Sequence, residues 1–139
     1  MERLMGNYPL FDSIIQFAKD NELSQKSAIR NKLAQLQIEF EVGRLLIYRV
    51  AFLMEEGRVP NWQSAMSKAY STEFEKHLAG VAMEILGLYG QLTSRSKLVP
   101  LRGMALHSYL ASKGYSLQAG TTEILKNVLA VRGLGLPSS

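Results

Sequence analysis

The groups in this 139-residue chain that could do chemistry are two histidines, several closely spaced carboxylates and one Gly-Thr-Thr-Glu segment. His77 and His107 have no His-Glu-x-x-His or Glu-x-x-His spacing around them, whereas a di-iron bundle needs Glu-x-x-His on two helices. The carboxylate pairs stand one or two residues apart, so their members do not face each other across a helical turn. These spacings argue against a metal site; the pairs are Glu39/Glu41, Glu55/Glu56 and Glu73/Glu75.

Nucleophilic catalysis has no better support in the sequence. No serine lies in a Gly-x-Ser-x-Gly segment, and neither histidine has an obvious orienting partner. The chain contains no cysteine, which excludes a disulfide scaffold, thiolate metal ligands and a cysteine nucleophile.

Anion binding has a physical basis at residues 120–123. Gly120, Thr121, Thr122 and Glu123 open an expected helix, where free backbone N–H groups and the helix dipole favour a negative charge. An ordinary helix start, with Thr121 as N-cap and Glu123 in the first turn, explains the same residues. Spacing alone favours the ordinary helix start over anion binding but does not exclude either interpretation.

Charge is distributed unevenly along the chain. The net charge is +4, but residues 95–139 carry six basic side chains against Glu123 alone. A basic segment of this kind suits an anionic partner such as a phosphate-bearing cofactor, an anionic membrane or a nucleic acid, or it forms a solvated face without a ligand. We expect no nucleic acid, because the basic residues lack interleaved aromatic residues and a recognition helix. No membrane is expected either, because no apolar run approaches the roughly 18 residues of a span.

Helical periodicity dominates the chain and must supply the framework for these residues. Apolar residues repeat at steps of three and four over residues 25–56 and again over 61–90, which predicts two long antiparallel helices. Shorter helices are expected at 8–20, 101–113 and 121–133, with Ser24 and Asn61 as N-caps. The predicted stripe of the first long helix is Ile29, Leu33, Leu36, Phe40, Gly43, Ile47, Val50 and Met54.

These elements predict an all-α fold and one domain over residues 1–139. We expect an up-and-down four-helix bundle with short additional helices at its ends. Composition agrees with a globular domain, since 47% of the residues are hydrophobic and 20% are charged.

Residues 119–137 resemble the C-terminal signature of the flavin-dependent acyl-CoA dehydrogenases. That family typically ends in a Gly-Thr-Ser-Glu/Gln-Ile-Gln-Arg-Asn helix, and a bacterial subset closes with Gly-Leu-Pro. Residues 29–34 and 41–46 look like its paired long helices, and residues 67–73 followed by 84–87 resemble the next helix and its flavin-contacting end.

The resemblance implies the C-terminal four-helix domain of a longer, cytoplasmic enzyme that also has an N-terminal helical domain and a middle β domain. Such enzymes desaturate acyl-CoA thioesters with FAD and pass electrons to an acceptor. The C-terminal domain contributes flavin contacts and forms the core of a homodimer or homotetramer. The chain alone is expected to be inactive.

The family's functional positions map onto this sequence one by one. Gly120 matches the substrate-adjacent glycine, and Thr121 and Glu123 match flavin-contacting positions. Glu84, Gly87 and Leu88 fall on the Gln-x-x-Gly-Gly flavin motif, although only Gly87 matches it fully. The family's Arg-x-x-Phe-Gly motif is not seen near residues 18–25.

The catalytic base departs from the majority pattern. Ala119 occupies the place of the usual glutamate, and a methyl group cannot accept a proton. Some branches carry the base on the first helix in a Glu-Arg pair, which Glu2-Arg3 resembles, so Glu2 is the candidate base. The remaining option is a non-catalytic subunit. Outside the family, the alternative is a helical adaptor with a basic anion-binding face.

Overall fold

The computed structural model describes the backbone of residues 2–118 and 120–138, with side chains from residue 4 onward. Within these residues the regular structure is entirely helical, which confirms the all-α class. Short 3₁₀ turns cover Leu23–Gln25, Gly87–Gln91 and Pro100–Gly103, and a π-helical turn covers Leu129–Gly133. The α-helices are α1 (Glu2–Gly6), α2 (Tyr8–Asp20), α3 (Ser27–Glu55), α4 (Asn61–Leu86), α5 (Met104–Tyr115) and α6 (Thr122–Val128).

The predicted helices are present, but several boundaries differ. Ser24 was wrong as an N-cap, because residues 23–25 form a 3₁₀ turn and Lys26 takes the cap position of α3. Asn61 is the first residue of α4 rather than its cap. Helix α4 ends four residues early, because Gly87 adopts a left-handed φ of 57° that breaks the helical path. Helix α1 was not predicted.

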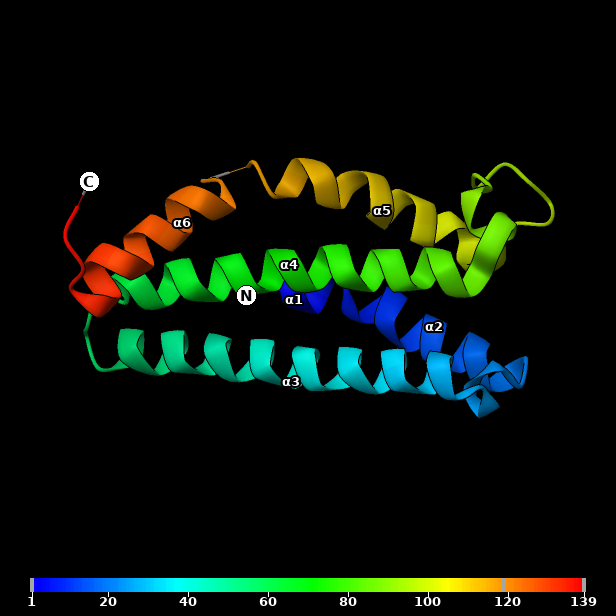
Figure 1. Cartoon of the computed structure of the whole chain (residues 1–139), viewed down its shortest axis with the longest axis horizontal. Helices are drawn as coiled ribbons and strands as arrows, with labels where there is room; N and C mark the ends of the chain where they lie inside the picture. The colour runs from blue at the N-terminus through cyan, green and yellow to red at the C-terminus, as the bar shows by residue number, and fades with distance from the viewer. Residues whose placement is uncertain (1, 119, 139) are drawn as a thin grey trace.

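Helix α4 runs through the middle of the molecule (Figure 1). Helix α3 lies antiparallel along one side of α4, and α5 and α6 follow one another along the opposite side. Helices α1 and α2 contact both α3 and α4 or the turns beside them. The exact four-helix arrangement stays a prediction, since α5 and α6 share one side of α4.

Packing on two sides explains why α4 has two kinds of buried face. Phe74, Leu78 and Val81 lie on one face and belong to the apolar repeat predicted over residues 61–90. Small side chains line the other buried positions, where α5 and α6 approach closely. These small residues are Ala65, Ala69, Thr72 and Ala79.

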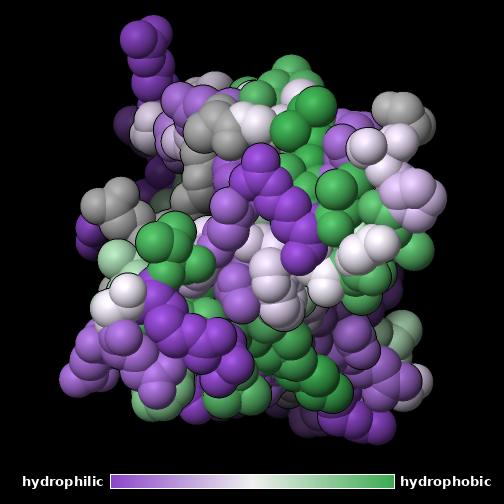
Figure 2. All heavy atoms as spheres, turned by 90° about the vertical axis from the view of Figure 1, so that its left-hand side faces the viewer, coloured by the Kyte–Doolittle hydropathy of each residue, from purple (hydrophilic) through white to green (hydrophobic). Residues whose placement is uncertain are grey.

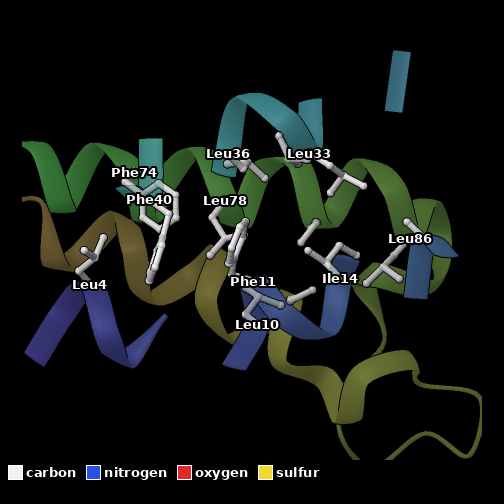
Figure 3. Packing of buried hydrophobic residues seen from close by; sticks show 14 of the residues in the cluster. Leu4, Leu10, Phe11, Ile14, Leu33, Leu36, Phe40, Phe74, Leu78 and Leu86 are labelled. Carbon is white, nitrogen blue, oxygen red and sulfur yellow. The ribbon is translucent and has the colours of Figure 1, made fainter. Parts of the chain in front are cut away.

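Aromatic rings join α2, α3 and α4 at the centre of the core (Figure 3). Phe11 stacks on Phe40 with ring centroids 5.3 Å apart, and Phe74 meets Phe40 at 5.9 Å. Helix α1 closes the core at Leu4, which is 1% exposed and packs over Gly43 of α3. A Cβ atom at Gly43 would lie 3.0 Å from a Leu4 methyl group, so the missing side chain permits this contact.

The predicted α3 stripe drifts near its C-terminal end. Met54 is 63% exposed, whereas Leu53 is 1% exposed and takes its place in the core. An α-helix turns every 3.6 residues, so a repeat of three and four residues moves gradually off a fixed face. The predicted buried stripe is therefore correct at Phe40 but wrong at Met54.

Apolar side chains also remain at the surface. Figure 2 shows the end at which α3 joins α4, with separate green apolar patches among purple polar side chains. Exposed residues from this end include Val59 and Leu134, at 87% and 76%. None of the described helices is long and apolar enough to cross a membrane.

We expect Leu78→Ala to lower the free energy of unfolding by about 2–5 kcal/mol, because it removes buried methyl groups and leaves a cavity. Leu78 is 0% exposed on α4. Leu110→Ala is the matched control, since Leu110 is 62% exposed on α5, and its effect should be within about 0.5 kcal/mol. Urea unfolding followed by circular dichroism measures both, and equal losses would contradict the assigned core.

Candidate functional site

The segment before α6 is held against α4 by Lys68. The Lys68 Nζ atom donates hydrogen bonds to the backbone carbonyls of Gln118, at 2.6 Å, and Gly120, at 2.5 Å. The two carbonyls belong to residues on either side of position 119. One ammonium group therefore fixes the chain where the resemblance places the substrate-adjacent glycine.

Glu73 provides a second anchor between α4 and α6. The buried Thr122 donates from Oγ1 to Glu73 Oε1 at 3.2 Å, and Lys76 Nζ donates to the same oxygen at 3.0 Å. The hydrogen bond from Lys76 is the main reason that the pKa of Glu73 lies below its ordinary value of 4.5, and Thr122 lowers it further.

The first turn of α6 has the predicted cap. The Thr121 side chain accepts a hydrogen bond from the Ile124 N–H at 3.4 Å, which confirms Thr121 as N-cap. Gly120 adopts a φ of 99°, a conformation that residues with a side chain rarely take. Exposed Glu123 lies in the first turn, where hydrogen bonds from its own backbone N–H and from Thr121 lower its pKa.

The second group of predicted flavin contacts lies at the other end of α4. Glu84 forms an ion pair with Lys32 of α3. Gly87 starts the turn after α4, with open space around it, and Leu88 is 82% exposed. The C-terminal end of α4 therefore exposes the apolar side chain of Leu88 and the backbone of Gly87 at the domain surface.

The structure does not bring the two groups together. Gly120 is bonded to Lys68, which precedes Glu84 by about 24 Å of helical rise along α4. Glu2 begins α1, but its side chain lies outside the described part of the chain, and Ala119 lies outside the described residues altogether. The predicted contact positions therefore lie in two separate regions of the domain. The side chain of the candidate base, Glu2, is not among the described ones.

Sequence reasoning missed Lys68 and the contact between Glu73 and Thr122. A signal for Lys68 was present, since Lys68 falls between Ala65, Ala69 and Thr72 on one face of α4. A lysine on a face of small buried residues is unusual, because an ammonium needs polar partners when it leaves water. The partners themselves are about fifty residues away, and no local pattern names them.

A polar pocket of about 360 Å³ lies beside the junction of α1 and α2. Glu75, which is 6% exposed, lines it together with Asn7, His107 and Tyr115. The other histidine, His77, pairs its Nδ1 atom with Glu39 Oε2 at 2.7 Å on the surface between α3 and α4. His77 is therefore an exposed residue of α4 with a carboxylate partner on α3.

Docking of α6 should weaken in acid. The pKa of Glu73 is lowered in the folded chain, so its contribution to stability is present above the ordinary value of 4.5 and is lost as pH falls through the folded-state pKa. We expect amide protection factors in α6 to fall as the pH drops below that ordinary value, while those in α3 persist. Hydrogen exchange measures both sets.

Glu73→Gln is the control, because the amide can still accept the Thr122 hydrogen bond but carries no titrating charge. The acid-dependent loss in α6 should become smaller in this variant, with the remainder coming from Glu123. An unchanged pH profile in Glu73→Gln would contradict the assignment.

Comparisons with known proteins agree with the all-helical fold and identify the family of the chain. Residues 9–134 match the family described as acyl-CoA dehydrogenase, C-terminal domain. The chain is 32% identical over 108 residues to glutaryl-CoA dehydrogenase of Desulfococcus multivorans, covering 77% of this chain and 26% of that protein.

Two solved structures have the same fold. The Tcur3481-Tcur3483 steroid ACAD is 25% identical with a TM-score of 0.88, covering 94% of this chain and 34% of that one. The ChsE4-ChsE5 complex from Mycobacterium tuberculosis is 22% identical with a TM-score of 0.86, covering 99% and 36%, and supports the fold alone. The chain spans about a quarter to a third of these proteins. It belongs to the acyl-CoA dehydrogenase family and corresponds to that family's C-terminal domain.

Proposed function

We propose that this chain is the C-terminal domain of an FAD-dependent enzyme that desaturates acyl-CoA thioesters. The observation that carries the proposal is the Gly120–Thr121 start of α6, held to α4 by Lys68, in a chain that matches the family over residues 9–134. The relative that acts on glutaryl-CoA supports a CoA thioester as the substrate class. The acyl-chain length of the substrate and the identity of the electron acceptor are properties of the whole protein.

The α6 end fits the roles that the resemblance implies, with Gly120 beside the substrate and Thr121 and Glu123 beside the flavin. Gly120 offers backbone without a side chain, and Thr121 offers a hydroxyl at the beginning of the helix. When bound, FAD would accept the β-hydrogen of the substrate as a hydride. The residues of this chain would orient the cofactor and the thioester.

The α4 end supports a contact with a cofactor held by a neighbouring subunit. Glu84, Gly87 and Leu88 lie too far along α4 to share a compact ligand with Gly120. Their exposure leaves them accessible from outside the domain. We therefore assign them to a flavin across a subunit interface, with Leu88 as an apolar contact.

Glu2 is the proposed base. Its carboxylate could remove the α proton of the thioester, a role that the methyl group of Ala119 cannot take. Helix α1 carries Glu2 and is tied to the core by Leu4, two residues later. That tie gives the base a fixed helix rather than a loose chain end.

Oligomerisation is supported by an apolar stripe on α3. The stripe consists of Ile38, Val42, Leu45, Tyr48 and Phe52, whose exposed fractions are between 38% and 61%. These residues lie on the face of α3 opposite Phe40 and Ile47 and continue for about four turns. A contiguous apolar face of this kind is typical of a protein–protein interface, so we propose that α3 packs in a homodimer or homotetramer.

The alternative function is a helical adaptor with a basic anion-binding face. The structure weakens it, because the basic residues of the C-terminal third occupy both ends of α4. Arg95 and Lys97 follow the turn after α4, while Arg132 donates to Asn61 at the start of α4. A single basic face is therefore not formed by these residues.

In the intact enzyme, we expect Glu2→Gln to lower turnover of acyl-CoA substrates by on the order of 10²- to 10⁴-fold, because the amide cannot accept the α proton. Flavin content should be unchanged. The control is Glu55→Gln, which changes an exposed residue of α3 and should retain wild-type turnover. Steady-state assays with an artificial electron acceptor measure the effect. Near-normal turnover of Glu2→Gln would remove Glu2 as the base.

The isolated chain should self-associate at concentrations on the order of tens of micromolar, because the α3 stripe loses water contact on association. Leu45→Lys should shift sedimentation towards the monomer, since a charge in the interface centre lacks a partner. Val59→Lys changes an 87% exposed residue outside the stripe and should not. A strictly monomeric wild-type chain would contradict the interface.

A further inference from the structure

We infer that Lys68 is the positioning residue of the proposed active site, because its ammonium fixes the backbone at Gln118 and Gly120 and so sets the place of Gly120 and the first turn of α6. The inference rests on the proposed function of this segment. Neither the family match nor the relatives' names assign a role to Lys68.

The placement of Lys68 on α4 favours this role. The neighbouring positions on its face are Ala65 and Ala69, which are 7% and 9% exposed, so small side chains leave room for the lysine stem. Thr72, one turn further on, donates its hydroxyl to the Lys68 carbonyl and stays out of the way of the ammonium. The stem therefore leads from the rigid central helix towards the segment before α6.

The chemistry of the ammonium suits two converging carbonyls. Lysine has three donors on one compact charged atom, and two of them reach oxygens at 2.6 and 2.5 Å. Charged hydrogen bonds are stronger than neutral ones. An apolar side chain of similar length could fill the same space but would leave both carbonyls without these donors.

The second anchor makes the effect of Lys68 separable from folding. Thr122 is tied to Glu73 independently, and α6 packs along α4 beyond that point. Loss of the ammonium should therefore loosen Gln118, Gly120 and Thr121 while α6 remains docked. A purely structural role would instead be seen as a change across the whole domain.

Hydrogen exchange on this chain tests the positioning. The reporter amides are Ile124, which donates to the Thr121 side chain, and Leu125, which donates to the Thr121 carbonyl at 3.0 Å. In Lys68→Met we expect both to exchange about tenfold faster, the effect of losing a charged hydrogen bond. Amides in the middle of α3 should be unchanged.

Two further variants make the result specific. Lys68→Arg keeps charged donors and should recover most of the protection, whereas Lys19→Met removes an exposed lysine on α2 and should have no effect. Unchanged exchange in Lys68→Met, or equal loss in Lys68→Arg, would overturn the inference.

Kinetics of the intact enzyme provide the second readout. Because a displaced Gly120 would misalign bound substrate rather than prevent its binding, Lys68→Met should lower kcat about tenfold with KM for the acyl-CoA little changed. Lys68→Arg should restore kcat in part. Wild-type kcat in Lys68→Met would overturn the positioning role, whereas an intact wild-type protein that desaturates no acyl-CoA would overturn the proposed function itself.

Discussion

Burial of α4 on two sides is the constraint on which the rest of the structure depends. Bulky residues such as Phe74 and Leu78 face the core shared with α2 and α3. Small residues such as Ala69 and Ala79 let α5 and α6 approach the opposite side. A helix in this position cannot tolerate large changes on either face, because both are close-packed. The remaining helices are arranged around it.

The same helix also organises the candidate site. Lys68 and Glu73 both project from α4 and hold the two ends of the segment that leads into α6. Since α4 is fixed by packing, its side chains provide a rigid reference for a segment whose own glycine takes a left-handed φ. Rigid placement of this kind is what an active site needs when its groups come from elements distant in sequence.

The exposed surface suggests how this domain takes part in a larger protein. Its α3 stripe lies opposite the core, and Leu88 projects where α4 ends. The chain covers 26% of its glutaryl-CoA dehydrogenase relative and 34% of the steroid ACAD chain. We interpret the apolar exposure as surface for the proposed contacts with subunits, and the proposed flavin positions lie in two separated groups.

The sequence by itself determined the longer helices, the α3 core around Phe40 and the Thr121 cap, because 3.6-residue periodicity and capping are local properties. It also determined the family, through the segment around Gly120. Only the tertiary structure decided that α4 is buried on two sides and that Lys68 holds Gly120. The physical reason is distance along the chain: Lys68 and Gly120 are joined by packing between helices, and neither residue carries a local pattern that specifies its partner.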